Sequence, residues 1–320
     1  MAKRGVIILA IGEKQGSTIY GNLAFNLALS LKSNCDVDIT LLYSDKSISE
    51  LRSFHLAYFD KFIKVPKECF TQGSKLQYQK AKTYLYWLSP YDETIYIDAD
   101  ALWMPYYIPK DAKWRNNDER YYIYQYTRDI DALFDSLKGK HYTAAVGGLL
   151  DIKTGTGKMG YTHWRANTKQ TMDTIIPYYN LTEGLLPQYQ TTFQYFEKTD
   201  KAERVFKKAL EIYEDDDKPC NRWADGFPDE FCFNVASCIE GLQPDISFMP
   251  VFVEFIHGKI INQKSLYERY SIFTNCGAKV SGNVKLHYNN LAKRYCDLNN
   301  IPYTFYHVDK RNVLTERLHG

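Results

Sequence analysis

The sequence predicts an α/β fold, in which a mostly parallel sheet is flanked by helices. Apolar runs of strand length recur at 5–12, 37–44 and 94–98, and segments with helical spacing of apolar residues lie between them. Strands that alternate with helices in this way form a parallel sheet with helices on both faces. With 320 residues, 45% of them hydrophobic, the chain can bury such a core.

The helices are predicted from apolar spacing and from capping residues. Leu23, Leu27 and Leu31 predict a helix over 20–32, and a second helix is expected over 75–88, before the turn at Pro90. A third helix is expected over 199–215, where Thr199 or Asp200 can cap its N-terminus. Residues 106–190 show no alternation of strands and helices and predict an inserted layer of short strands and loops.

Composition and cysteine usage favour a soluble protein of the cytoplasm. The net charge is +2, which excludes no class of partner. The seven cysteines contain no CxxC pair, as is typical of reduced thiols. No apolar run has the length and flanks of a signal peptide or a membrane span, so we expect no membrane partner.

Two carboxylates stand directly after the apolar run at 95–97. Asp98 and Asp100 are separated only by Ala99. Ligands of parallel α/β sheets bind at the carboxyl ends of the strands, and these residues occupy such an end. Hard oxygen ligands suit Mg²⁺ or Mn²⁺, which take further ligands from substrate phosphates and water. A lone Asp-x-Asp is weak evidence, but the apolar strand before it strengthens the interpretation.

This segment resembles the GT-A fold glycosyltransferases, which have a Rossmann-like sheet and use nucleotide-sugar donors. KTYLYWLSPYDETIYIDAD is similar to a stretch of the glycogenin-like, or family-eight-like, retaining enzymes. The resemblance implies that Asp98 and Asp100 hold the metal that bridges the donor diphosphate, and that Lys82 contacts the donor. It also implies a UDP-sugar donor whose binding site includes Ala10, Ile11, Tyr20 and Ala99.

A second match lies near the C-terminus, in HYNNLAK. In the family pattern the histidine, here His287, is the third metal ligand, and the lysine, here Lys293, binds the pyrophosphate. The usual glycine of that loop is replaced by Asn290, and the residues after the lysine differ from the pattern. His257, with Lys259, is the rival pair, and we favour His287 because it fits the pattern more closely.

The segment GFPDEFCFNVA resembles an acidic stretch near the acceptor in these enzymes. Asp229 and Glu230 follow Pro228, which is also ordinary chemistry for a helix N-terminus, so a purely structural role explains them equally well. In an inverting enzyme one of them would be the general base. In a retaining enzyme both would orient the acceptor, and the sequence leaves the two courses open.

The acceptor is predicted from charge and from a looser resemblance. The stretch 152–172 is basic and interleaved with aromatic residues, and from 255 to 320 there are ten Lys and Arg against four Asp and Glu. Such patterns suit a phosphate backbone. The chain also resembles phage-encoded glycosyltransferases, which implies a 5-hydroxymethylpyrimidine in duplex DNA as acceptor, in the host cytoplasm. The predicted acceptor residues are Lys158, Trp164, Arg165 and Gln190.

These inferences predict one GT-A domain over 1–320. Its parts would be a nucleotide-sugar-binding half at 1–110, an acceptor-side insertion at 111–190, the remaining core with the metal loop at 191–295, and a tail at 296–320. The alternative function is a bacterial-type transferase acting on a polysaccharide or small glycan. A haloacid-dehalogenase-like phosphatase also carries an Asp-x-Asp motif, usually on its first strand, and an inactive binding module is the third class.

Overall fold

The computed structural model shows a chain that divides into two compact units. It describes residues 3–11, 20–104, 129–158, 171–220, 226–244, 251–252, 272–274 and 282–302. Unit 1 comprises Met1–Lys3, Val65–Ile95 and Leu137–Met249, and unit 2 comprises Arg4–Lys64, Tyr96–Ser136 and Pro250–Gly320. Each unit is described by itself.

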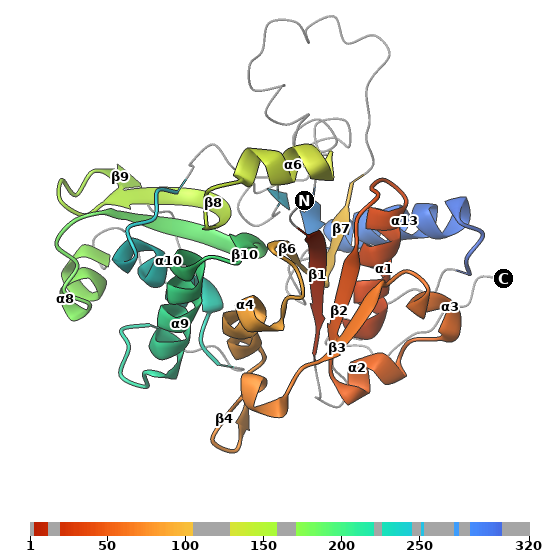
Figure 1. Ribbon diagram of the computed structural model, residues 1–320, viewed down its shortest axis with the longest axis horizontal. Coiled ribbons are helices and arrows are strands. Elements are labelled where there is room, and N and C mark those ends of the chain that lie inside the picture. The colour runs from red at the N-terminus through yellow and green to blue at the C-terminus, as the bar shows by residue number, and fades with distance from the viewer. Residues whose placement is uncertain are drawn as a thin grey trace, which may run out of the picture. The chain divides into compact units, whose positions relative to one another are not determined.

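Unit 2 contains the parallel strands that the sequence predicts. Strands β3, β2 and β1 run parallel in the order β3-β2-β1, and β6 is the next neighbour of β1 (Figure 1). The elements are β1 (Arg4–Ala10), α1 (Tyr20–Lys32), β2 (Ile39–Tyr43), α2 (Asp45–Ser49), α3 (Ser53–Leu56), β3 (Lys61–Lys64), β6 (Glu93–Asp98), β7 (Ala101–Trp103), α6 (Ile130–Leu137), β11 (Val251–Phe252), β12 (Ile272–Thr274) and α13 (Gly282–Leu298). The first half of β6 belongs to unit 1 and the second half to unit 2.

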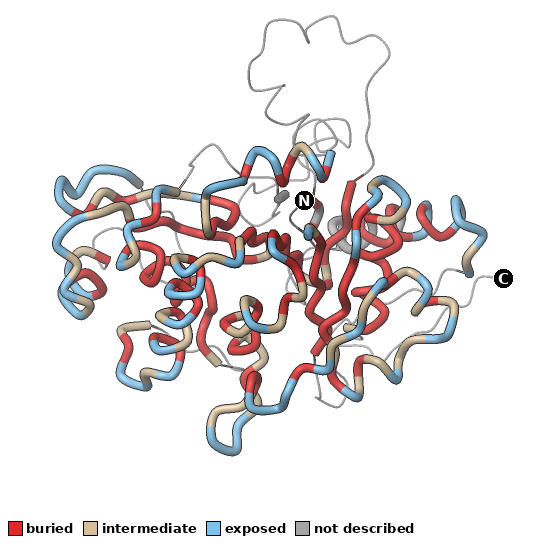
Figure 2. Tube along the Cα trace, viewed as in Figure 1, coloured by how far each residue is buried: buried red, intermediate tan, exposed pale blue. Residues whose placement is uncertain are grey.

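The core of unit 2 lies on β1, β2 and α1. Val6, Ile7 and Ile8 are fully buried, and the buried trace of β1 and β2 is continuous in Figure 2. Strands that are covered on both faces need apolar side chains at every position, which explains the unbroken apolar runs in the sequence. Helix α1 is buried along almost its whole length, including Asn22 and Asn26.

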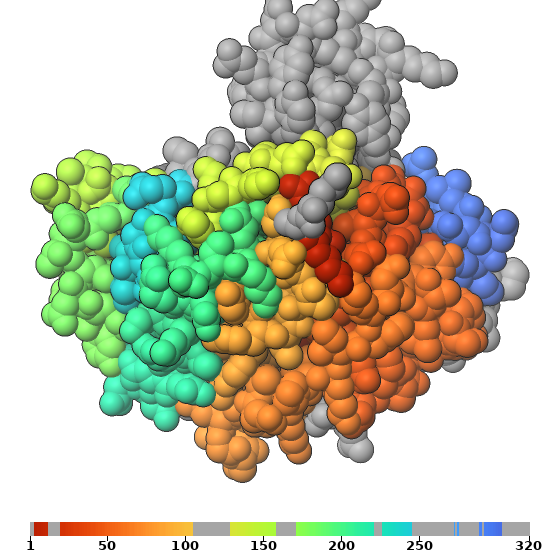
Figure 3. Space-filling model, viewed as in Figure 1, coloured from red at the N-terminus to blue at the C-terminus, as the bar shows by residue number. Residues whose placement is uncertain are grey.

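Unit 1 combines an antiparallel layer with a pair of packed helices. Beside the first half of β6, the strand order is β6-β10-β8-β9, and the β10–β8 and β8–β9 pairs are antiparallel. Helix α10 packs on β10 and α9. Helix α9 also contacts η2 and α4, and the atoms of 200–214 lie beside those of 78–88 on the face shown in Figure 3. The elements are η1 (Lys67–Phe70), β4 (Thr71–Gln72), β5 (Lys75–Leu76), η2 (Tyr78–Tyr84), α4 (Leu85–Leu88), β8 (Tyr142–Asp151), β9 (Gly157–Lys158), η4 (Thr171–Ile175), α8 (Ile176–Tyr178), β10 (Leu185–Glu197), α9 (Asp200–Glu214) and α10 (Asp229–Ile239).

An aromatic cluster joins the helices of unit 1 to the antiparallel strands. The rings of Tyr142 on β8 and Phe233 on α10 stack with centroids 5.2 Å apart, and Phe206 on α9 meets Phe233 edge to face at 5.2 Å. Aromatic pairs in these geometries contribute about 0.5–1.5 kcal/mol beyond the area they bury. The cluster therefore fixes α9 and α10 against β8.

The α/β fold class predicted from the sequence is confirmed, with a mostly parallel sheet flanked by helices. Helix α9 begins after Thr199, whose hydroxyl accepts a hydrogen bond from the Ala202 N–H, as the capping prediction required. Among the described helices, none is long and apolar enough to cross a membrane.

The single helix expected over 75–88 is wrong. The chain forms the short strand β5, the 3₁₀-helix η2 and the one-turn helix α4. Gln77, with φ −138° and ψ 82°, lies outside the helical region and separates the first two. Inside η2, the buried Lys80 ammonium reaches the Thr71 carbonyl at 3.0 Å and the Glu214 carboxylate at 2.8 Å. These long-range contacts decide the local conformation, and apolar spacing does not encode them.

A carboxyl group with a raised pKa lies at the start of α1. The Gly21 N–H donates to Oε2 of Glu50 at 2.9 Å. Burial raises the pKa of Glu50 to about 7, although the Gly21 hydrogen bond and the Lys46 charge act in the opposite direction. Gly21 itself has no room for a side chain, since an added Cβ would lie 2.2 Å from the Ser47 carbonyl oxygen.

We predict that Glu50 makes the protein less stable as the pH rises. Because its folded pKa of about 7 lies above the 4.5 of an unperturbed glutamate, its contribution to stability is complete below pH 4.5 and is lost as the pH passes through about 7. Thermal unfolding of Glu50→Gln should therefore show a smaller loss of Tm between pH 5 and pH 8 than the wild type. Asp45→Asn, at an exposed carboxyl group on α2, is the control. An equal pH dependence in wild type and Glu50→Gln would contradict the prediction.

Candidate active site

The Asp-x-Asp motif lies at the carboxyl end of β6. Residues 93–97 of this strand are buried, whereas Asp98 and Asp100 are half-buried. Tyr96 and Asp98 are two residues apart and so share a face of the strand, where the Tyr96 hydroxyl donates to Oδ1 of Asp98. Ala99 and Asp100 form the turn before β7. The buried strand thus delivers two carboxylates to the surface, as the sequence predicts.

The Asp98–Asp100 turn leads into β7, whose last residue, Trp103, is held by hydrogen bonds from two helices. The Trp103 N–H donates to Ser30 Oγ of α1 at 2.9 Å, and the Tyr295 hydroxyl of α13 donates to the Trp103 carbonyl at 2.7 Å. Strand β7 also pairs with β12 in antiparallel fashion. With both sides of its backbone bound, β7 leaves the Asp98–Asp100 turn little freedom to move within unit 2.

The segment HYNNLAK lies in helix α13, where the sequence predicted a loop. Tyr288 is fully buried, and its pKa is raised first by that burial and also by the charge of Asp100. Tyr288 is the residue that follows His287. The side chain of His287, and both His257 and Lys259, lie outside the described residues.

Lys293 lies on the exposed surface of α13. Its Nζ contacts both carboxylate oxygens of Asp297, at 2.7 and 2.6 Å. An i,i+4 pair of this kind contributes little to stability. In this arrangement the Lys293 charge is directed along the helix toward Asp297, so a role in binding pyrophosphate would require the Lys293 side chain to turn away from it.

The donor set suits a hard divalent cation. Mg²⁺ is commonly bound by one or two carboxylates together with substrate phosphates and water, and Asp98 and Asp100 supply such a pair. Within the described ranges, no group of three or more His, Cys, Asp and Glu side chains forms a ready-made metal site. The described chain therefore fits a cation that is shared with a phosphate ligand and does not show a closed protein cage.

The end of β1 belongs to the same unit as the Asp-x-Asp motif. The side chains of Ala10 and Ile11 are 0% and 4% exposed, so a ligand can meet them chiefly through their backbone. The Ala10 carbonyl accepts from the Ser44 N–H at 3.3 Å and from the Ser47 hydroxyl, which ties β1 to the start of α2. Tyr20 is half-buried at the first residue of α1.

Unit 1 brings Lys82 and Asp229 together as a buried ion pair. Lys82 Nζ lies 3.2 Å from Asp229 Oδ2, with side-chain exposures of 13% and 3%. Lys82 comes from η2, and Asp229 is the first residue of α10, after Pro228 at the N-cap. A carboxylate is favoured at a helix N-terminus by the partial positive charge there. The sequence predicted both residues for the site, in separate roles.

Thr191 on β10 completes this pair and was not predicted. Its hydroxyl donates to Asp229 Oδ2 at 2.6 Å, and Thr191 is 1% exposed. A threonine in a strand is common, so the sequence held no signal for it. Two other predicted residues are buried in the same unit, Glu230 in the first turn of α10 and Gln190 next to Thr191 on β10.

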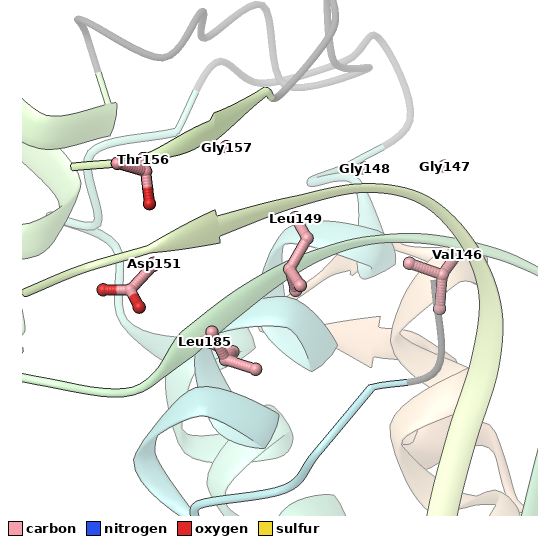
Figure 4. Close-up of a pocket in the computed structure, with 8 residues that line it drawn as sticks. All are labelled: Val146, Gly147, Gly148, Leu149, Asp151, Thr156, Gly157 and Leu185. Atoms are coloured by element: carbon pink, nitrogen blue, oxygen red, sulfur yellow. The ribbon is translucent and has the colours of Figure 1, made fainter. Parts of the chain in front are cut away.

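The predicted acceptor residues are only partly described. Lys158 is the last residue of β9, and its side chain lies outside the described residues, as do Trp164 and Arg165. A cavity of about 440 Å³ adjoins β9 (Figure 4). It is lined by Val146, Gly147, Gly148, Leu149, Asp151, Thr156, Gly157 and Leu185. Asp151 Oδ1 accepts from the Thr154 N–H at 2.9 Å, so that carboxylate already stabilises the turn at 151–154.

No family model matches the sequence, and no curated protein matches it significantly. Solved structures that resemble the chain include the bifunctional glycosyltransferase WbbM, with 11% identity and a TM-score of 0.48 over 86% of this chain and 46% of that one. The galactosyltransferase LgtC, in complex with donor and acceptor sugar analogues, is 14% identical, with a TM-score of 0.46. The match covers 92% of this chain and 95% of LgtC. Mouse xyloside xylosyltransferase 1 is 10% identical, with a TM-score of 0.45. The match covers 87% of this chain and 99% of the xylosyltransferase.

The chain thus corresponds to about half the length of WbbM. With TM-scores below 0.5 and identities of at most 14% in these three, the proposal below rests on the residues of this chain.

We predict that the Lys82–Asp229 pair is strongly coupled. Lys82→Met or Asp229→Asn alone leaves one buried charge without its partner, which typically costs about 3–5 kcal/mol of the free energy of unfolding. The double variant should lose clearly less than the sum of the single losses, as contacting residues do. Urea unfolding of the four proteins measures this coupling.

The matched control is the exposed pair of Lys61 and Asp38, whose Nζ and Oδ2 lie 3.0 Å apart with side-chain exposures of 30% and 46%. Lys61→Met and Asp38→Asn should each cost less than about 1 kcal/mol. Strictly additive effects at Lys82 and Asp229 would show that the two side chains do not stabilise each other.

Proposed function

We propose that the protein is a metal-dependent glycosyltransferase of the GT-A type that takes its sugar from a UDP-sugar donor. The observation that carries this proposal is the pair of half-buried carboxylates, Asp98 and Asp100, at the carboxyl end of a buried strand. Ligands of α/β sheets bind at such strand ends. The end of β1, with Ala10 and Ile11, belongs to the same unit as this pair, which supports the proposal.

Each predicted residue has a role in this proposal. Asp98 and Asp100 would hold Mn²⁺ or Mg²⁺, with His287 as a third ligand, and Lys293 would bind the pyrophosphate once released from Asp297. Ala10, Ile11 and Tyr20 would contact the uridine. When bound, the cation neutralises the charge that develops on the diphosphate leaving group. By resemblance to the family, Lys82 would contact the donor, and Asp229 and Glu230 would either orient the acceptor or supply the general base.

We predict that UDP binding depends on the metal and on the Asp-x-Asp motif. In a thermal-shift experiment, UDP should raise the Tm of the wild type when Mn²⁺ is present, because a ligand of the native state stabilises it by mass action. EDTA should abolish the shift. Asp98→Asn and Asp100→Asn should fold normally and lose most of it, whereas Asp36→Asn, an exposed carboxyl group of unit 2, should retain it.

A wild type that shows no shift with UDP under any metal condition would disprove this proposal. It would favour either a phosphatase or an inactive binding module. A phosphatase would be recognised by hydrolysis of a phosphate monoester that Asp98→Asn abolishes. Full retention of the UDP shift in both Asp variants would place the nucleotide elsewhere.

For the acceptor we propose a 5-hydroxymethylpyrimidine in duplex DNA. The support is the basic stretch 152–172, in which Lys153 is exposed on the turn after β8, and the basic composition of 255–320. A base in a duplex must be turned out of the stack before its hydroxymethyl group can reach an enzyme site. A polysaccharide or small glycan is the alternative acceptor, and it needs no basic surface.

We predict salt-dependent DNA binding. The affinity for a duplex should fall steeply as salt increases, because each lysine or arginine that contacts a phosphate releases counterions. Lys153→Gln should reduce the slope of log Kd against log salt by about 1, whereas Lys67→Gln, at an exposed lysine of η1, should leave it unchanged. Sugar transfer to hydroxymethylated but not to unmodified duplex completes the test. Absence of salt-sensitive binding would point to the glycan.

A further inference from the structure

The cavity beside β9 lies where β8 departs from regular pairing. The register of β10 with β8 shifts between Val146 and Gly148, so Gly147 has no opposite residue on β10. Such a bulge leaves the extra residue unpaired and bends its strand. On the other edge of β8, the described pairing with β9 begins only at Leu149. The peptide groups of Gly147, which is exposed, therefore line the cavity outside the paired part of the sheet.

The cavity has the size of a site for a small organic ring. Its volume of about 440 Å³ falls within the range of about 300–1,000 Å³ that is usual for ligand pockets. All of its described lining comes from 146–157 and from Leu185, which belong to unit 1. Binding in this cavity can therefore be argued from unit 1 by itself.

Apolar and polar side chains occupy different parts of the cavity wall. Figure 4 shows Leu149 and Leu185 in the middle and Val146 to one side, with Asp151 and Thr156 at the opposite end. Leu185 is opposite Asp151 in the β10–β8 register, and Leu149 is two residues before Asp151, so these three share a face of the sheet. A sugar has hydroxyl groups around its whole ring, and those against the leucines would lose their hydrogen bonds. A planar base, with apolar faces and a polar edge, matches this division.

The polar end of the cavity is an acceptor. The Thr154 N–H, which donates to Asp151 Oδ1 at 2.9 Å, lowers the pKa of that carboxyl group, so Asp151 is ionised at neutral pH. A carboxylate accepts from several donors at once. The amino group of cytosine is the donor that Asp and Glu accept when proteins read base edges. This end of the cavity therefore suits a base of the cytosine type.

A lysine stands on the turn that borders the cavity. Lys153 is exposed on the turn between β8 and β9, two residues after Asp151. The turn is fixed by the Gly155 N–H, which donates to the Asp151 carbonyl at 2.9 Å. The surrounding stretch 152–172 has basic residues and no acidic ones. A neutral base in the cavity, with its phosphates toward Lys153, would match this charge.

We propose that the cavity holds a cytosine-type base extruded from duplex DNA, with Lys153 near the phosphates of the same strand. Extrusion breaks the stacking and pairing of the base, and a pocket for the extruded base must offset that cost. Contact with Leu149 and Leu185 and a hydrogen bond to Asp151 would do so. This inference rests on the proposed DNA acceptor. It concerns the recognition of a base by unit 1, and no step of it involves the sugar donor.

The test fills the cavity and leaves Lys153 in place. Leu149→Trp and Leu185→Trp each add bulk there, one from β8 and the other from β10. The probes are two duplexes with a single 5-hydroxymethylcytosine, which is paired with guanine in one and mispaired with adenine in the other. A mispaired base is extruded at lower cost, so the wild type should bind the mispaired duplex about tenfold more tightly. Both variants should bind the two duplexes equally, without donor or metal present.

A second readout reports extrusion directly. With 2-aminopurine placed next to the 5-hydroxymethylcytosine, the wild type should raise its fluorescence because the neighbouring base leaves the stack, and both variants should not. The slope of log Kd against log salt should stay at the wild-type value, since Lys153 is unchanged. Leu181→Trp is the matched control, because Leu181 is also a half-buried leucine of unit 1 and is not among the described lining residues. It should behave as the wild type.

The outcomes distinguish this inference from the proposed function. Salt-sensitive DNA binding with no preference between the duplexes and no rise in fluorescence would overturn the base cavity and leave the DNA acceptor in place. A wild-type preference in both folded variants would also overturn it, and the Tm of each variant shows which is folded. If the wild type binds no DNA, the DNA acceptor fails, and the free nucleoside 5-hydroxymethyl-2′-deoxycytidine decides. A rise in wild-type Tm that Leu149→Trp removes would support a base-binding cavity, and no rise would overturn it.

Discussion

The buried pairing of Lys82 with Asp229 is the constraint on which the arrangement of unit 1 depends. Two ions in a region of low dielectric cost free energy unless each is compensated, and here the compensating groups come from three elements. Lys82 is carried by η2, Asp229 by the start of α10, and the Thr191 hydroxyl by β10. A shift of any one of them by a residue would leave a charge buried without its partner. The ion pair and the Thr191 hydrogen bond thus tie η2, the start of α10 and β10 together.

In unit 2 the corresponding constraint is the hydrogen bonding of the Trp103 backbone. Trp103 is fully buried, and its N–H and carbonyl are both used by side chains, Ser30 on one side and Tyr295 on the other. Buried backbone groups must be paired, and β7 is too short to satisfy them all through strand pairing. These two hydrogen bonds hold α1 and α13 to β7. The placement of α13 against β7 follows from this pairing.

Residue patterns predicted the parts of the molecule that local chemistry determines. The apolar runs gave β1, β2 and β6, the apolar spacing at Leu23, Leu27 and Leu31 gave α1, and the Thr199 cap gave the start of α9. The Asp-x-Asp motif was found because two carboxylates after an apolar strand are unusual.

Predictions from the sequence were wrong or incomplete where contacts between residues far apart in the chain determine the local structure. Periodicity predicts a regular helix at 75–88, but the long reach of Lys80 to Glu214 draws that segment into η2. Thr191 is an ordinary strand residue in the sequence, and only the fold shows that its hydroxyl lies 2.6 Å from the Asp229 carboxylate. Strand β10 was hidden within a segment that lacked alternation, because its pairing with β8 is interrupted by register shifts.

The geometry of the ion pair also bears on the chemistry of the proposed transfer. Asp229 Oδ2 accepts from both Lys82 Nζ and Thr191 Oγ1, and a carboxylate oxygen offers two lone pairs. A general base needs a lone pair within hydrogen-bond distance of the acceptor proton. As long as the pair is intact, this oxygen has none to offer, and it could be released only if Lys82 turned toward the donor. Oδ1 of the same carboxylate has its own lone pairs. In either course the proposed contact of Asp229 with the acceptor would therefore fall to Oδ1, while Oδ2 holds Lys82 and Thr191.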